Sequence, residues 1–162
     1  MIDWESRPFE VRNLFNPAFC AVVLASALHA YEKHAGKPMP YSLSLLVLPL
    51  CLHQGTRDEM VASPKTSILR IIARRPDLLI NFARRSQGLI QPAMEAFALL
   101  ASRACIEVRE TGGLRLLPKK VSLEPLSTDD AEACRTTAAL LGRQFAQIND
   151  RVTIYTTLGI RP

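Results

Sequence analysis

The apolar positions of the chain are densest over residues 17–28, where the only polar side chain is Ser26. Asn16 can cap the free N–H groups of a helix that begins here, and Pro17 suits the first position because that position needs no donor. A helix that is apolar on all sides is buried. Charged residues from Glu32 onward follow too soon for a membrane span, which needs about 20 apolar residues. We therefore predict a central helix around which the other segments pack.

A second apolar run, Leu43–Leu52, follows a break at residues 36–40, where one glycine and two prolines separate the two runs. Ser42 is placed to cap this run. Periodicity alone does not separate a helix from a buried strand here. Pro49 argues against a central strand, and leucine outnumbers the β-branched residues, so we predict a kinked helix.

Two stretches of this half of the chain are expected to lie outside the helices. Residues 1–15 carry Trp4, Phe9 and Phe15 among charges, and we interpret them as an arm that packs back on the core. The polar stretch His53–Lys65 is predicted to be a surface loop.

The pattern of residues 66–104 predicts three short helices, because prolines suited to a first helical position precede two of its apolar runs. The three are a helix capped by Thr66 or Ser67, a helix over Leu78–Arg85 that closes near Gly88, and a helix over Ala93–Ala104 that Pro92 opens. The inward positions expected in the last one are Met94, Phe97, Leu100, Ala101 and Ala104.

After the third helix the apolar period changes from helical to alternating. Ile106 and Val108 are expected to face one way, with charged residues between them. The pair Gly112-Gly113 supplies the positive φ angles of a tight hairpin, and residues 114–116 form the returning strand. Three short helices followed by a hairpin is the element order of a winged helix.

The last third of the chain predicts one long amphipathic helix after a connector at residues 118–126. Ser127 and Thr128, followed by two aspartates, have the composition of a helix start. Gly142 interrupts the helix interior at a cost of about 1 kcal/mol relative to alanine, which indicates close approach of another backbone. The tail around Val152-Thr153-Ile154-Tyr155 is β-prone. The expected apolar stripe is Ala131, Cys134, Ala138, Leu141, Phe145 and Ile148.

These elements predict a mainly α fold with a winged-helix-like unit and one β-hairpin. The chain has 162 residues and 48% apolar content, enough for one sizeable core. We expect a single domain made of core helices and arm (1–63), the winged-helix-like unit (64–118), and the long helix with its tail (119–162).

The net charge of +5 is concentrated in the middle of the chain. Residues 64–104 hold seven Lys or Arg against two Asp or Glu, which indicates a surface for a partner. The planar guanidinium group of arginine can form two parallel hydrogen bonds with a carboxylate or a phosphate. The candidate partner-binding residues are Arg70, Arg74, Arg75, Arg84, Arg85 and Arg103.

Three interpretations of these arginines remain open: contacts to a partner protein, contacts to DNA phosphates, or a charged surface that keeps the chain soluble. A DNA-reading helix presents polar side chains to base edges. The last helix of the predicted unit offers only Gln91, Glu95, Ser102 and Arg103 beside a wide apolar face. That composition favours a protein partner, with any DNA contact indirect or secondary.

The sequence offers little for catalysis. No phosphate-binding glycine loop, nucleophile elbow or zinc-binding His-Glu-x-x-His motif occurs. The three histidines lack metal-ligand spacing, and the four cysteines lie at least 29 residues apart and are interpreted as buried thiols. We therefore expect neither enzymatic activity nor a metal or cofactor. Without a recognisable leader, the protein is expected in the cytoplasm.

Several segments resemble one protein family almost from end to end. They are RPFEVRNLFNPAFC at Arg7–Cys20, MPYSLSLLVLPLCLHQGTR at Met39–Arg57, Thr66–Arg85, Thr128–Ala146 with its LGRQFA ending, and the terminal TIYTTLGIRP. The chain is similar to the middle component of prokaryotic three-component ABC-ATPase systems, the group to which Lamassu-type anti-phage defence belongs.

The resemblance implies a small non-enzymatic adaptor that joins or controls a large SMC-like coiled-coil ABC ATPase and a variable effector, often a nuclease. It carries over no catalytic residue. The alternative from another class is a stand-alone winged-helix DNA-binding protein.

Overall fold

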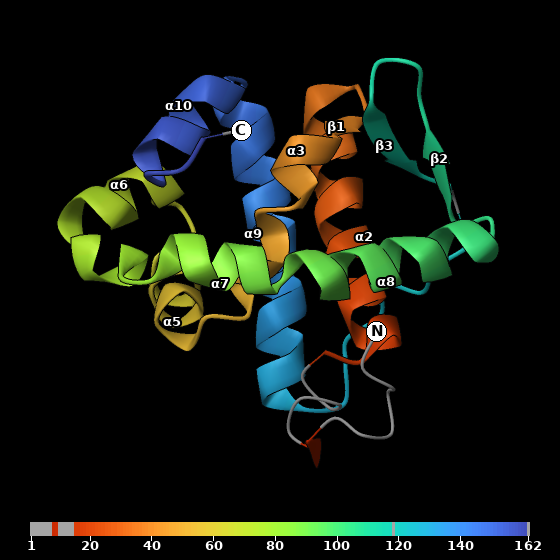
Figure 1. The fold of residues 1–162 in the computed structure, drawn as a ribbon, viewed down its shortest axis with the longest axis horizontal. Helices are drawn as coiled ribbons and strands as arrows, with labels where there is room; N and C mark the ends of the chain where they lie inside the picture. Colours follow the sequence, from red (N-terminus) through yellow and green to blue (C-terminus); the bar gives the residue numbers. More distant parts are fainter. Residues whose placement is uncertain (1–7, 10–14, 118, 162) are drawn as a thin grey trace.

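The computed structural model describes residues 8, 9, 15–117 and 119–161, so most of the predicted arm, including Trp4, lies outside the described residues. The fold is mainly helical, with a small antiparallel sheet at one end (Figure 1). In chain order its elements are α2 (Pro17–Ala35), β1 (Met39–Pro40), α3 (Tyr41–Ser44), α4 (Val47–Cys51), α5 (Gln54–Ala62), α6 (Ile68–Arg74), the 3-10 helix η2 (Pro76–Leu79), α7 (Phe82–Gly88), α8 (Ile90–Ser102), β2 (Ile106–Val108), β3 (Gly113–Leu116), α9 (Asp129–Ile148) and α10 (Arg151–Thr157).

Helix α2 is the buried centre of the molecule, as its composition predicts. Asn16 Oδ1 accepts from the Ala18 N–H at 2.8 Å, which caps the first turn as expected. Even Ser26 is buried, and its hydroxyl donates to the Val22 carbonyl at 2.9 Å. The helix ends at Gly36, whose φ of +65° is a left-handed conformation that glycine adopts without strain.

Helix α9 runs beside α2 in the same direction and forms its main packing partner (Figure 1). Thr128 caps it by accepting from the Ala131 N–H at 3.3 Å, so the predicted start is confirmed. The predicted stripe is also confirmed: its four central members are buried and its two ends are half-buried. A Cβ added at Gly142 would lie against the backbone of Ala27, 2.9 Å from its carbonyl carbon, so the expected close approach exists.

The run Leu43–Leu52 forms two short helices, α3 and α4, rather than one kinked helix. The break lies at Leu45 and Leu46, before Pro49, which occupies the first turn of α4 where a missing N–H costs nothing. Ser42 lies inside α3 and does not cap it, because the N-cap position is Pro40.

The prediction of a surface loop over His53–Lys65 is wrong, because most of this stretch forms helix α5. Thr56 and Met60 are buried four residues apart on one face, and the Arg57 guanidinium reaches α9. This polar helix depends on contacts from α9, so its own apolar pattern was too weak to predict it.

The three helices predicted over residues 66–104 exist with changed boundaries. Ser67 Oγ caps α6 by accepting from Leu69 N–H at 3.3 Å. The second divides into η2 and α7 at Asn81, whose φ is +59°. The third begins at Ile90, and Pro92 occupies its first turn. Met94, Ala101 and Ala104 face solvent instead of the core, whereas Phe97 and Leu100 are buried as expected. Residues newly found on the inner face are Ala93 and Ala96.

The hairpin of β2 and β3 forms as predicted, with Glu107 paired to Arg115. Of the two glycines in the turn, Gly112 alone has a positive φ, of +77°. Gly113 is required for a different reason, because a Cβ at this position would lie 2.9 Å from the Cβ of Pro38. The sheet gains an unpredicted third strand, β1, which pairs with β3 and gives the order β1-β3-β2. A winged-helix-like arrangement is compatible with α6 to β3.

The prediction that the tail is β-prone is wrong, because residues 151–157 form helix α10. Asp150 caps it by accepting from the Val152 N–H at 3.0 Å. Tyr155 donates its hydroxyl hydrogen to the Ser42 carbonyl at 2.6 Å, which anchors α10 on α3. Contacts with α3, α6 and α9 therefore override the local β propensity.

Candidate partner-binding surface

The structure separates the six candidate arginines into two groups. Five lie on or beside α6 and α7, at one end of the long axis, whereas Arg103 follows α8 at the other end, near the sheet (Figure 1). A single surface containing all six is therefore not formed. The charge excess of residues 64–104 is contiguous in sequence but not in space.

Arg75 and Arg85 make contacts within the protein. Arg75 donates to both carboxylate oxygens of Asp77, at 2.9 and 2.8 Å, and also pairs with Glu59. These acidic partners raise the pKa of the Arg75 guanidinium further above its usual value. Arg85 donates to the carbonyls of Ile80 and Leu78 at 3.0 and 3.1 Å. Desolvation lowers the pKa of Arg85.

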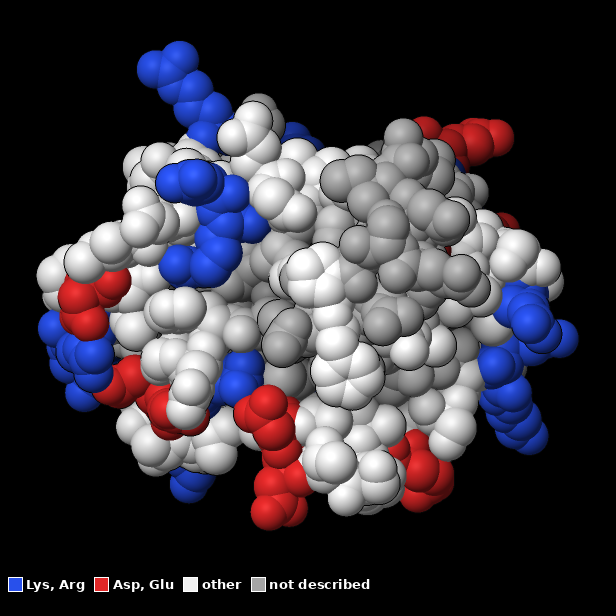
Figure 2. Space-filling view, turned by 60° about the horizontal axis from the view of Figure 1, so that its bottom comes forward, with Lys and Arg blue, Asp and Glu red and all other residues white. Residues whose placement is uncertain are grey.

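Arg70, Arg74 and Arg84 remain as exposed cations at this end. Among the described residues, no hydrogen bond or ion pair engages their guanidinium groups. On the face drawn in Figure 2, basic side chains lie toward both ends of the long axis and acidic side chains stand among them. This distribution resembles separate contact points more than a continuous phosphate-binding track.

Helix α8 presents an exposed apolar ridge between these two ends. The ridge consists of Ile90, Met94, Ala98 and Ala101, which face solvent at spacings of four, four and three residues. Ile90 and Met94 are each 47% exposed, and together with the two alanines they form a continuous apolar patch rather than scattered single residues.

Tyr41 extends the α8 ridge sideways. Its hydroxyl lies 3.0 Å from the Met94 sulfur, and its ring lies 5.8 Å from that of Phe97. The tyrosine is itself 39% exposed. The sequence pattern predicted an apolar face on this helix but placed Met94 on the buried side. The spacing of Ile90, Met94 and Ala98 was the available signal, because it defines a second apolar face.

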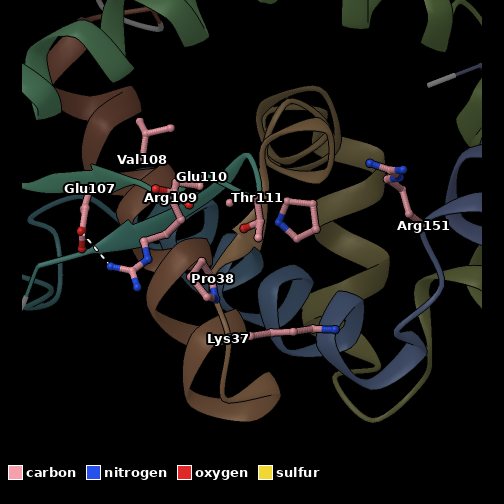
Figure 3. A pocket seen from close by; sticks show the side chains of 10 residues that line it. Lys37, Pro38, Glu107, Val108, Arg109, Glu110, Thr111 and Arg151 are labelled. Atoms are coloured by element: carbon pink, nitrogen blue, oxygen red, sulfur yellow. Dashed lines mark hydrogen bonds and ion pairs between the residues drawn. The ribbon is translucent and has the colours of Figure 1, made fainter.

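A hollow of about 960 Å³ lies between the hairpin and the start of α10 (Figure 3). Arg109 pairs with Glu107 at 2.9 Å on the hairpin wall. On the opposite wall, Lys37 donates to Asn149 Oδ1 at 3.0 Å and Arg151 to Ser42 Oγ at 3.4 Å. The hollow therefore carries charges of both signs and suits polar recognition.

The four cysteines and His53 contribute to packing in the described part of the chain, whereas His29 and His34 are exposed. All four cysteines are buried free thiols, as predicted. Desolvation raises the pKa of the Cys20 thiol to about 12. His53 accepts or donates a hydrogen bond with the Thr56 hydroxyl at 2.9 Å, and burial lowers its pKa. Within residues 8, 9, 15–117 and 119–161, no three His, Cys, Asp or Glu side chains gather as metal ligands.

The sequence matches a family model described as "ABC-three component (ABC-3C) system Middle Component 3", over residues 4–162. No curated protein and no solved structure gives a significant match. Over the described residues, each helix is too short or too polar to cross a bilayer.

Proposed function

The chain belongs to the Middle Component 3 family of ABC-three component systems, and on that premise we propose that it is a non-enzymatic adaptor. It links an SMC-like ABC ATPase to an effector, with a nuclease as the expected kind, in a Lamassu-type defence complex against phages and plasmids. The protein acts in the cytoplasm, where foreign DNA and the ATPase meet.

The α8 ridge is the observation that carries this proposal. A DNA-reading helix presents polar side chains outward, whereas the outward face of α8 carries Ile90, Met94 and two alanines. Exposed apolar side chains at helical spacing pack well against an amphipathic helix of another protein. The exposed Arg84 on α7, which packs against α8, and Arg70 and Arg74 on α6 supply cations for carboxylates of that partner.

The ATPase is the partner that we assign to the α8 ridge and the adjoining arginines. Foreign DNA captured by the ATPase changes its conformation, and the adaptor transmits this change to the effector. Transmission requires that the adaptor's contacts differ in free energy between the two ATPase states.

The test is co-purification of the full chain with the ATPase and the third component of the same system. Met94→Glu places a charge in the ridge without altering the buried face of α8. We expect it to lower ATPase recovery about tenfold, because an unpaired charge is desolvated at the interface. The matched control is Gln147→Glu, an exposed position on α9 outside both the ridge and the α6–α7 end, with unchanged recovery expected.

Two outcomes contradict the proposal. One is that the wild-type chain retains neither component after purification. The other is that the chain alone binds duplex DNA tightly, with affinity that falls steeply between low and moderate salt, as phosphate-binding proteins do. The second outcome would favour the stand-alone DNA-binding alternative.

A further inference from the structure

A second hollow, of about 510 Å³, lies between the carboxyl-terminal half of α2, strand β3 and the connector that follows β3. Its apolar lining is formed by Leu116, Leu117, Val121 and Leu123. Leu117, Val121 and Leu123 are half-buried, so they expose apolar surface to the hollow. We call this hollow the connector groove.

The rim of the connector groove is basic. Arg115 Nε donates to Glu32 Oε1 at 2.8 Å, so these two charges neutralise each other. Lys33 and Lys119 also line the groove, are exposed, and have no ion pair among the described residues. The connector groove therefore has an aliphatic floor and two uncompensated cations.

The aliphatic floor and the two cations together indicate which chemical class of ligand fits the connector groove. Sites for single-stranded nucleic acid combine cations with several aromatic side chains on which successive bases stack, whereas the described lining of this groove holds no Phe, Tyr or Trp and a single imidazole, that of His29. A small anion gains nothing from an aliphatic floor. An amphipathic peptide with aliphatic and acidic side chains satisfies both the floor and the rim.

The position of the connector groove bears on the adaptor role. The groove lies beside the sheet, at the opposite end of the long axis from α6 and α7 (Figure 1). A protein that joins two partners needs two surfaces that do not overlap. The connector groove and the α6–α7 end meet that requirement.

We propose that the connector groove binds an acidic, amphipathic segment of the effector component, while the α8 ridge and α6–α7 end hold the ATPase. This inference rests on the proposed adaptor function. It assigns the second interface, which the sequence did not indicate, because Lys33 on α2 and Lys119 in the connector are 86 residues apart in the chain.

The experiment uses two double charge reversals in the full chain, co-expressed with both other components. Lys33→Glu/Lys119→Glu alters the connector groove, and Arg70→Glu/Arg84→Glu alters the other end. Each single reversal changes the charge by two, so either double variant has a formal net charge of +1 in place of +5. The two variants therefore control each other for net charge.

We expect the groove variant to lose effector recovery about tenfold while ATPase recovery stays unchanged, because acidic side chains of the effector meet repulsion instead of attraction. The other variant shows the reverse pattern. A photo-crosslinking side chain at Lys119 joins the chain to an effector peptide that contains both acidic and aliphatic residues. All of the altered side chains are exposed, so the melting temperature of each variant stays close to that of the wild type.

The failures of the two proposals are distinguishable. If the wild type recovers neither component, the adaptor function itself is wrong. If the wild type recovers both and the groove variant does so equally well, the connector groove is not the second interface and the adaptor function stands. Loss of the ATPase from the groove variant, or crosslinking of Lys119 to DNA, also overturns the groove assignment.

Discussion

Arg57 shows how one buried polar side chain holds three segments together. Its Nη1 donates to the carbonyls of Cys51 and Leu52, at 3.2 and 3.0 Å, where α4 ends. Its Nη2 donates to Asp130 Oδ1 at 2.6 Å, on the first turn of α9. The guanidinium thus supplies donors to helix-end carbonyls that the backbone leaves without partners.

We expect Arg57→Ala to reduce the free energy of unfolding by about 2–4 kcal/mol, because the buried Cys51 carbonyl loses its donor at about 1–3 kcal/mol and the part-buried Leu52 carbonyl loses its donor at a smaller cost. Urea denaturation of both proteins measures this difference. The control is Asp130→Asn: the Asp130 side chain is 80% exposed, so a change below about 1 kcal/mol is expected. An Arg57→Ala variant as stable as the wild type would show that water replaces the guanidinium.

The packing of α2 against α9 is the most extensive contact between two elements in the described part of the fold. We expect Gly142→Ala to destabilise the protein by about 2 kcal/mol or more, because the new methyl group meets the Ala27 backbone, which has no flexible end to move aside. Alanine has a helix propensity about 1 kcal/mol more favourable than that of glycine. At this position the steric clash therefore acts against the gain in helix propensity. Thermal unfolding followed by circular dichroism checks the sign.

Gly88→Ala is the matched control for this substitution. Gly88 ends α7, and a Cβ there meets nothing within 4 Å. We expect its melting temperature to equal or slightly exceed that of the wild type. Equal effects of the two substitutions would refute the argument from close helix approach.

Glu132 fastens the connector to α9. It accepts from Arg135 Nε and from the Leu126 N–H, each at 2.8 Å. These bonds, Arg135 first, lower the pKa of the Glu132 carboxyl from 4.5 to about 2. A carboxylate with a lowered pKa in the folded state contributes stability that is present above pH 4.5 and is lost as the pH falls toward 2.

We therefore expect Glu132→Gln to remove part of the acid sensitivity of folding. The unfolding free energy of the wild type should fall more steeply from pH 5 to 2 than that of the variant. Denaturant titrations at several pH values compare the two slopes. Parallel slopes would mean that Glu132 has the same proton affinity in the folded and unfolded chain.

The separation of basic side chains between two ends limits how the protein as a unit binds DNA. Each neutralised phosphate contributes about −0.9 to the slope of log affinity against log salt. Arg70, Arg74 and Arg84 are the exposed arginines at the α6–α7 end whose guanidinium groups have no partner among the described residues, so we expect a slope no steeper than about −3 for the isolated chain. Fluorescence anisotropy with a labelled duplex across salt concentrations measures it. A much steeper slope would indicate a continuous phosphate-binding surface.

The sequence predicted those features of the fold and site that short-range chemistry fixes. Asn16 with Pro17, Ser67, and Thr128 mark helix starts because their side chains satisfy free N–H groups two or three residues away. The all-round apolar run after Pro17 predicted burial by composition alone. Gly142 predicted a close backbone contact without identifying Ala27. The apolar character of α8 likewise followed from its residues.

Tertiary structure decided the features whose partners lie far along the chain. Helix α5 is held through Arg57 by Asp130, and α10 through Tyr155 by Ser42, 113 residues away. Which face of α8 is buried, and where Arg103 lies relative to Arg70, depend on how the helices pack. Local patterns specify helix ends because capping acts within one turn, whereas burial and surface clustering depend on non-local contacts that no short stretch encodes.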